Sequence, residues 1–332
     1  MRYLSFLLFV LSVNCFSFSA LAEKKIGFVL STLQEERYQK DQKYFQEAAK
    51  KLGFTAVMAS ANNNAQTQTA KVENLLSMGV DALVIQPVNS KAAANLVKMA
   101  HEEKVPVVAY DRLIADAPVD AYITQDSFAV GKLQAEAAVK ATGGKGNYVI
   151  LMGEAGHSVA NEITKGVMSV LEKHKEIKIV VQKSHEGWST ANAMATVENA
   201  LTQYKNNIAA VIANNSGMAQ GAIQALQEQG LAGKVFVAGA DADLTSIKNI
   251  VAGRQQFEVL KDIKPLAETA ARVAFQLATT KKISEPHQLV GNGSGQVAVI
   301  ATPVYAINKD NLEERIFKTG FHQREAVFPK SK

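Results

Sequence analysis

Short apolar runs alternate with amphipathic stretches along most of this chain. The stretch Gln39–Leu52 places Phe45, Ala48, Ala49 and Leu52 at helical spacing, and Gly53 follows as a helix stop. Apolar runs separated by helices are typical of buried parallel strands in α/β proteins. We therefore predict strands at Ile26–Leu30, Thr55–Ala59, Ala82–Ile85, Val105–Tyr110, Ala121–Thr124, Asn147–Met152, Ile177–Gln182, Ala209–Ala213, Val235–Ala238 and Gln256–Leu260.

An internal repeat divides the pattern into two similar halves. The segment AKVENL at residues 70–75, followed by DALVI at 81–85, returns as ATVENA at 195–200 followed by AAVI at 209–212. The next run ends in VVAYD at 107–111 in the first copy and in VAGAD at 237–241 in the second. The repeat predicts two doubly wound α/β lobes with the same order of helices and strands.

Each copy of the repeat closes on an aspartate, Asp111 in the first and Asp241 in the second. In open parallel sheets, ligands bind beyond the carboxyl ends of the strands, where the loops converge. If the two halves face each other, the two carboxylates point into one shared cleft.

The first 22 residues are predicted to be a secretory signal peptide rather than part of the fold. Arg2 precedes the apolar run Leu4–Val13, and the stretch closes at the small-x-small site Ala20-Leu21-Ala22. The apolar run is shorter than the ~20 residues that a membrane-spanning helix needs. The single cysteine, Cys15, lies inside this segment, so the mature chain has none. The protein is therefore expected to be exported.

Composition excludes a disordered chain, a collagen and a disulfide scaffold. The chain has 332 residues, 36 Lys and Arg against 31 Asp and Glu, and 47% hydrophobic residues. This length predicts about two globular domains without metal or disulfide support. The small positive charge forms no basic arm, so no nucleic-acid partner is expected.

Motifs for catalysis or cofactor binding are weak. The six histidines show no metal-ligand spacing, and no metal or cofactor is predicted. The sequence GGKG at 143–146 lacks the pattern of a phosphate loop, and GNGSG at 291–295 has glycine where a nucleophile elbow needs serine. A pair of glycosidase carboxylates stays open as an alternative.

Planar polar side chains gather instead at the predicted strand ends. Carboxylates, amides and guanidinium groups satisfy sugar hydroxyls, and an aromatic face covers the apolar side of a sugar ring. A neutral polyol is therefore the expected ligand. The candidate residues are Arg37, Tyr38, Asp111, Arg112, Asn161, Trp188, Asn215, Asp241 and Lys261.

Six of these nine residues lie in blocks that resemble the periplasmic sugar-binding proteins of the ribose/galactose/xylose group. The resemblance implies a type I periplasmic binding fold, with an N-terminal lobe of residues 23–126 and 261–302 and a C-terminal lobe of 127–260 and 303–332. It also implies a hinge of three crossovers near 125–128, 258–262 and 301–304. The blocks are ERYQKD at 36–41, YDR at 110–112, GW at 187–188, ENALT at 198–202, GAIQAL at 221–226, DADL at 241–244 and GFH at 320–322.

The resemblance also implies roles for these residues. Arg37, Asp111, Arg112, Asn215, Asp241 and Lys261 match ligand groups of the family, Trp188 matches its stacking aromatic, and Tyr38 stands where the family has an aromatic residue. One loop departs from the pattern, because xylose binders carry a sugar-contacting Asp and Asn where this chain reads GHSVAN at 156–161. Asn161 is expected to replace that Asn.

The function that the resemblance implies is reception of a monosaccharide, xylose or a similar aldose, for a membrane permease of the ATP-driven (ABC) importer class. The protein is expected to be a monomer without catalytic activity. An alternative is a sensor that presents a sugar or signalling molecule to a chemoreceptor or sensor kinase. The sugar-binding core of a repressor shares the fold, but the predicted signal peptide occupies the place of its DNA-binding helices.

Overall fold

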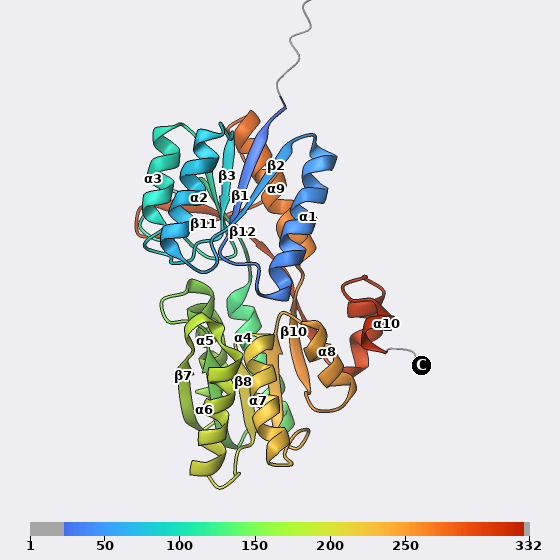
Figure 1. Cartoon of the computed structure of the whole chain (residues 1–332). Helices are drawn as coiled ribbons and strands as arrows, with labels where there is room; N and C mark the ends of the chain where they lie inside the picture. The colour runs from blue at the N-terminus through green and yellow to red at the C-terminus, as the bar shows by residue number, and fades with distance from the viewer. Residues whose placement is uncertain (1–22, 329–332) are drawn as a thin grey trace, which may run out of the picture.

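The predicted strands assemble into two sheets, one in each of two α/β lobes, which confirms the predicted fold class. The computed structural model describes residues 23–328, so the predicted signal peptide lies outside the described part of the chain. Each run predicted as a strand coincides with β1–β10 to within two residues at either end. Figure 1 shows the lobe that begins with β1 above and the lobe that contains β6–β9 below.

The first lobe is built on a seven-stranded sheet in the order β11-β12-β5-β4-β3-β1-β2. Its neighbours pair in parallel except β11 with β12. The apolar sides of the helices form two clusters, one on each face of the sheet. Its elements are β1 Lys25–Leu30, α1 Glu36–Leu52, β2 Thr55–Ser60, α2 Ala65–Ser77, β3 Ala82–Ile85, α3 Ala94–Glu102, β4 Val107–Tyr110, β5 Ala121–Gln125, α9 Ile263–Thr279, β11 Gln288–Gly291 and β12 Gln296–Thr302.

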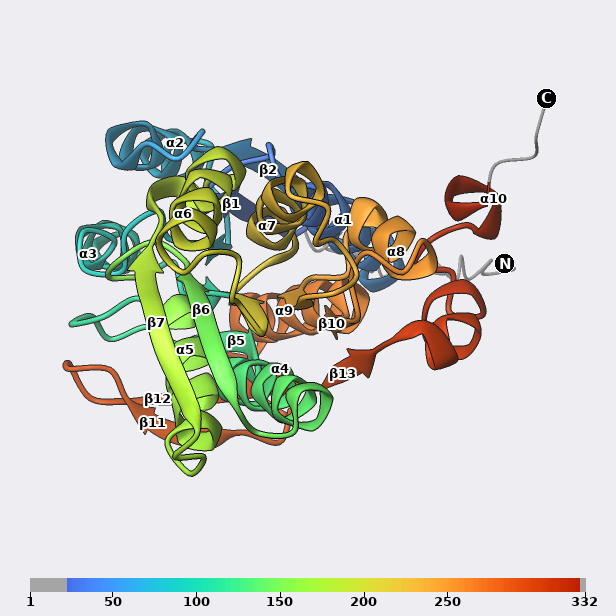
Figure 2. The same ribbon diagram turned by 90° about the horizontal axis from the view of Figure 1, so that it is seen from below.

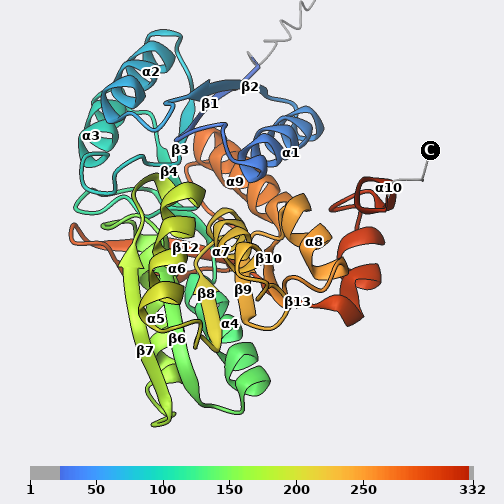
Figure 3. The ribbon, with the colours of Figure 1, turned by 60° about the horizontal axis from the view of Figure 1, so that its bottom comes forward.

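The second lobe has a six-stranded sheet in the order β13-β10-β9-β8-β6-β7, parallel except for β13. Its elements are α4 Ser127–Thr142, β6 Gly146–Met152, α5 Ser158–Leu171, β7 Ile177–Ser184, the 3-10 turn η1 Glu186–Trp188, α6 Thr190–Gln203, β8 Ala210–Ala213, α7 Ser216–Glu228, β9 Phe236–Ala240, α8 Leu244–Val251, β10 Phe257–Lys261 and β13 Val304–Ile307. The chain then forms η2 Lys309–Asn311, η3 Glu313–Phe317 and α10 Arg324–Val327, which lies beside α8 (Figures 1 and 3).

The two sheets repeat one strand order, as the internal sequence repeat predicts. In the first lobe β2-β1-β3-β4-β5 lie side by side, and in the second β7-β6-β8-β9-β10 follow the same order. The repeated sequences occupy α2 and α6, β3 and β8, and β4 and β9. Asp111 and Asp241 therefore follow equivalent strands.

The chain passes between the sheets three times, after β5, after β10 and after β12. Lys261 is the last residue of β10 in the six-stranded sheet, one residue later than the boundary expected from sequence. At these passages Gln125 Nε2 donates to the carbonyl oxygen of Asp262 at 3.2 Å, and Thr302 Oγ1 donates to that of Thr124 at 3.3 Å. The three connections are thus tied to one another; Figure 2 shows the strands and helices around them from below.

The sheet edges differ from the sequence prediction. Strands β11, β12 and β13 were not predicted, and residues 292–295 of the sequence GNGSG form the turn that joins β11 to β12. All four residues of β11 are exposed, so this strand lacks the apolar run that marks a buried strand. The helix expected from Gln39 begins three residues earlier, at Glu36.

Two glycines allow α4 and α5 to approach closely. A Cβ atom on Gly166 of α5 would lie 2.1 Å from the carbonyl oxygen of Phe128, and one on Gly131 of α4 would lie 1.8 Å from that of Ile163. Neither position tolerates a side chain without separating the helices.

Replacing Gly166 with Ala is therefore expected to lower the free energy of unfolding by about 1–3 kcal/mol, because the added methyl group separates α4 from α5. Gly295→Ala is the matched control, since a Cβ atom there meets nothing within 4 Å, and its change should stay within about 0.5 kcal/mol. Urea unfolding of both variants measures the difference. Equal effects would contradict the close helix contact.

Candidate functional site

A small cavity lies between the lobes, beyond the carboxyl ends of the central strands. The free space inside it is about 10 Å³. Three carboxylates and three cationic groups line it, together with an amide, two aromatic rings and one aliphatic side chain: Glu35, Asp111, Asp241, Arg37, Arg112, Lys261, Asn215, Tyr38, Trp188 and Val159. All the residues predicted as ligand groups except Asn161 thus lie around one cavity.

The fold delivers these side chains from strand ends and helix starts. Asp111 and Asp241 directly follow β4 and β9, and Lys261 ends β10. Arg37 lies in the first turn of α1, whereas Asn215 is the N-cap of α7, where its Oδ1 accepts a hydrogen bond from Met218 N. These are the positions at which a doubly wound sheet presents ligand groups.

The backbone at both aspartates is left-handed, with φ of 61° at Asp111 and 104° at Asp241. Such a conformation is uncommon for residues other than glycine and costs conformational energy. In both lobes the aspartate N–H donates to the neighbouring strand, Asp111 to Ile123 O and Asp241 to Val259 O. In each lobe this hydrogen bond to the neighbouring strand therefore stabilises the turn that directs the aspartate carboxylate into the cavity.

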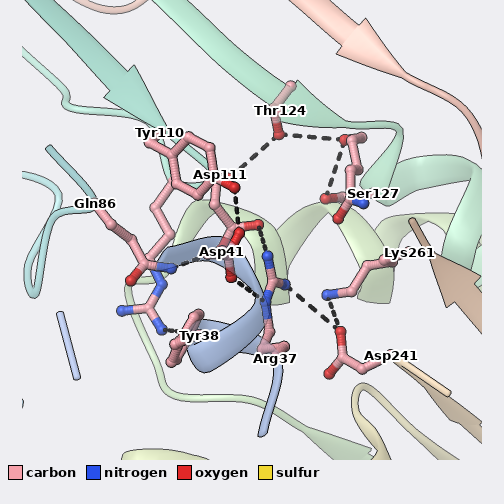
Figure 4. A network of polar contacts seen from close by, with 12 residues as sticks. Arg37, Tyr38, Asp41, Gln86, Tyr110, Asp111, Thr124, Ser127, Asp241 and Lys261 are labelled. Atoms are coloured by element: carbon pink, nitrogen blue, oxygen red, sulfur yellow. Dashed lines mark hydrogen bonds and ion pairs between the residues drawn. The ribbon is translucent and has the colours of Figure 1, made fainter. Parts of the chain in front are cut away.

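Arg37 joins the two halves of the site (Figure 4). Its guanidinium group lies 3.1 Å from Asp111 Oδ1, 3.6 Å from Asp41 Oδ2 and 3.5 Å from Asp241 Oδ1. The arginine and the three carboxylates are at most about 5% exposed. A buried cation needs such partners, since an unpaired charge in the interior is very costly.

Asp111 is held as an anion. Burial alone would raise the pKa of its carboxyl group, but Arg37, Lys261 and Arg112 outweigh burial and hold it at about 2. Its second oxygen accepts a hydrogen bond from Gln86 Nε2 at 3.1 Å, and Gln86 Oε1 in turn accepts from the backbone and hydroxyl of Ser31. The Asp111 carboxylate is thus fixed in place from behind.

Asp41 behaves differently although it shares the same arginine. Burial raises the pKa of its carboxyl group to about 7, against the opposing effects of Arg37 and of the hydrogen bond from the Tyr110 hydroxyl. Asp41 does not line the cavity. It therefore supports Arg37 from beneath rather than facing a ligand.

In the second lobe, Lys261 pairs with Asp241, with Nζ 2.7 Å from Oδ1.

In the first lobe, Arg112 donates to the Tyr38 hydroxyl at 3.0 Å and to the carbonyl oxygen of Pro87 at 3.3 Å. Among the lining carboxylates, Glu35 has no side-chain hydrogen bond within residues 23–328, although it stands at the N-cap of α1. Burial raises its pKa, opposed mainly by Arg112.

The placement of Asn161 differs from the expectation. Residues 158–161 form the first turn of α5, so Val159 and Asn161 point about 200° apart around the helix axis. Val159 lines the cavity and Asn161 is exposed to solvent. The only cavity-lining side chain from the departing loop at 156–161 is therefore apolar.

The same loop supplies contacts that sequence reasoning missed. His157 Nδ1 accepts a hydrogen bond from Trp188 Nε1 at 3.2 Å, and its Nε2 lies 3.0 Å from Val88 O in the first lobe. Burial and Arg112 lower the pKa of His157, which favours the neutral ring that this pattern needs. Glu35 was missed as well, although it directly precedes the block ERYQKD that the sequence singled out.

The part of the chain that the structure describes contains no cluster of His, Cys, Asp and Glu suited to a metal ion. None of its helices is both long enough and apolar enough to cross a membrane.

A family model described as a periplasmic binding protein domain matches residues 26–282. The chain belongs to this family. It is 42% identical over 309 residues to the D-xylose-binding periplasmic protein of Escherichia coli, covering 92% of this chain and 93% of that one. The protein of the same name from Haemophilus influenzae is 39% identical over 321 residues, which are 96% of each chain.

Solved structures of the family include an ABC transporter periplasmic solute binding protein from Actinobacillus succinogenes with bound D-allose. It superposes on this chain with a TM-score of 0.78 at 26% identity, covering 88% of this chain and 99% of that one. These similarities agree with the family resemblance of the sequence blocks.

Arg37→Met is expected to lower the free energy of unfolding by about 3–5 kcal/mol at pH 7, because buried carboxylates lose their shared cation. Native Asp111 has a pKa of about 2, below its ordinary value of 3.8. The stability that this pairing contributes is therefore present above about pH 4 and is lost as the pH falls toward 2. The gap between wild type and variant should narrow on acidification in urea unfolding experiments.

Lys51→Met is the control for this prediction, because Lys51 is 66% exposed and lies 3.5 Å from Glu268. Such a surface pair contributes at most about 1 kcal/mol. A loss for Arg37→Met that is no larger than that of the control, or that does not change with pH, would contradict the role given to Arg37.

Proposed function

We propose that this protein is a periplasmic receptor for a monosaccharide, D-xylose or a similar aldose, and that it delivers the sugar to an ABC-type membrane permease. The observation that supports this most directly is the cavity between the lobes, lined by Arg37, Asp111, Arg112, Asn215, Asp241 and Lys261. The names of the relatives, two D-xylose-binding periplasmic proteins and a D-allose-bound solute binding protein, point to the same class of ligand.

The balance of charge in the cavity favours a neutral ligand. Its three carboxylates balance its three cationic groups, so an uncharged ligand leaves no excess charge in the closed site. The carboxylate of Glu35 and the amide of Asn215 can bind sugar hydroxyls, and Trp188 can cover the apolar face of the ring.

Binding is coupled to closure of the lobes in this proposal. Direct contacts join the lobes around the cavity: Arg37 to Asp241 at 3.5 Å, Leu113 N to Ser158 Oγ at 3.1 Å, and Leu244 N to Glu36 Oε2 at 3.1 Å. A ligand that touches both lobes shifts the equilibrium toward the closed form by its differential affinity for that form. The moving units are residues 23–125 and 263–302 against 127–261 and 303–328, with the three passages as the hinge.

We propose further that the protein acts in the periplasm as a monomer after removal of residues 1–22, and that it has no catalytic activity. The closed form is what a permease would recognise. Presentation to a chemoreceptor or sensor kinase would use the same closure.

The first test is a titration of refolded residues 23–332 with D-xylose, D-ribose, L-arabinose, D-allose and D-glucose. Trp188 is the only tryptophan, so its emission reports on the cavity. Saturable binding of at least one aldose is expected, with a rise in melting temperature since the ligand binds only the folded state. Failure of every monosaccharide to bind would overturn the proposal, and release of sugar from an oligosaccharide would favour a glycosidase.

Two asparagines provide a matched pair of variants. Asn215→Ala should weaken sugar binding about 10-fold to 100-fold, because it leaves a sugar hydroxyl without its partner in a closed site. Asn161→Ala should leave affinity unchanged, since Asn161 is exposed outside the cavity. Isothermal titration of both variants with the sugar that binds most tightly measures the effect. A loss of affinity in Asn161→Ala equal to that in Asn215→Ala would contradict the assigned site.

A further inference from the structure

A buried carboxylate lies behind the sugar cavity and does not line it. Glu258, on β10, is completely buried. It faces Gly239 of the neighbouring strand β9, where a Cβ atom would lie 2.2 Å from Glu258 Oε1. The absence of a side chain at Gly239 therefore makes the space that the carboxylate occupies.

Glu258 connects the groups that aim Asp241 and Asn215 into the cavity. Its Oε2 accepts hydrogen bonds from Ala242 N at 3.2 Å and from the Ser216 hydroxyl at 3.1 Å. Ser216 directly follows Asn215, and its Oγ also accepts from Asp243 N at 3.2 Å. One carboxylate oxygen thus ties the turn after β9 to the start of α7.

This turn needs such support, because its backbone is strained at two successive positions. Asp241 has a φ of 104° and Ala242 a φ of 55°, which are conformations that favour glycine. The Asp241 N–H is held by Val259 O of β10, but the Ala242 N–H has the Glu258 carboxylate as its acceptor. Loss of that acceptor would leave the Ala242 N–H without a partner, and His322 Nε2, 2.8 Å from Ala242 O, would be the remaining hydrogen-bond partner of this residue.

The surroundings of Glu258 are acidic or neutral. Asp241 and Asp243 face it from the turn, Gln255 Nε2 donates to its Oε1 at 2.7 Å, and Ser246 of α8 lies beside it. Its register partner on β13 is Ile307. Within residues 23–328 it has no salt-bridge partner, so burial raises its pKa to about 7, against its hydrogen bonds.

We propose that Glu258 is a positioning residue for the sugar site: while ionised it holds the turn at residues 241–243, and when protonated it releases that turn and weakens sugar binding. A carboxylate can accept all three of the observed hydrogen bonds, whereas the protonated form must give up an acceptor site. The inference rests on the proposed function, because Asp241 matters here as a ligand group.

The test compares wild type with Glu258→Gln, using D-xylose, or the aldose of the panel that binds most tightly, in titrations from pH 8 to pH 5.5. At pH 8 the variant should bind about tenfold more weakly, because the amide cannot replace a charged acceptor. The ratio of the two dissociation constants should approach one at pH 5.5, where wild-type Glu258 is also uncharged. The ratio cancels the titration of Asp41, whose raised pKa has no contribution from Glu258, whereas the pKa of Asp243 is raised in part by Glu258 and falls in the variant.

A second readout separates positioning from general stability. Native Glu258 has its pKa raised above the ordinary value of 4.5, so its contribution to stability increases as the pH falls through about 7 toward 4.5. The melting temperature of unliganded wild type relative to Glu258→Gln should therefore rise on acidification while its relative sugar affinity falls. Glu73→Gln, at an exposed site on α2, is the control and should match wild type in both measurements.

Ser216→Ala keeps the test decisive if Glu258→Gln fails to fold. Removal of the Ser216 hydroxyl takes a hydrogen-bond donor from the Glu258 carboxylate and so raises the pKa of Glu258. The midpoint of the plot of sugar affinity against pH should therefore lie at higher pH than in wild type. A midpoint that does not move, or a ratio for Glu258→Gln that is constant with pH, would overturn the inference. Failure of wild type to bind any sugar would instead count against the proposed function.

Discussion

The arrangement of the whole site depends on one buried guanidinium group. Arg37 contacts Asp41 and Asp111 in its own lobe and Asp241 in the other. Because charges so deeply buried must be paired, the arginine and the aspartates determine one another's positions. The fork geometry of arginine makes this possible, since one planar group can serve several acceptors in fixed directions. The same group that neutralises the first lobe's carboxylates therefore also reaches the second lobe.

Repetition of one supersecondary unit explains why the partners of Arg37 lie where they do. The equivalent strands β4 and β9 are each followed by an aspartate in left-handed conformation, and each aspartate N–H donates a hydrogen bond to the neighbouring strand. The two copies of the repeat differ in the residue that supports the aspartate from the side away from the cavity. Asp111 is backed by Gln86, a neutral amide, whereas the Asp241 turn is backed by Glu258, an acid. The repeat thus produced two similar turns that each hold an aspartate carboxylate. In the proposed mechanism, only the turn that carries Asp241 responds to protonation, through Glu258.

The sequence predicted those features that local patterns encode. Buried parallel strands carry continuous apolar runs, so β1–β10 were recognised, whereas β11 is exposed along its length and was missed. The cavity-lining positions of Arg37, Asp111 and Asp241 followed from their place after strands. Asn161, predicted as a ligand group, lies outside the cavity, because the direction of a helical side chain depends on where α5 begins, and a shift of one or two residues turns it to another face.

By itself, then, the amino-acid sequence determined the two-lobed α/β class, the repeated order of elements and the chemical character of the site, since these arise from periodicity and from residue type at strand ends. Only the tertiary structure decided which polar groups are shared across the lobes and which are left for a ligand. Contacts such as Arg37 with Asp241 and His157 with Val88 join residues 204 and 69 positions apart. Their geometry is set by the packing of whole lobes, and no local pattern records it.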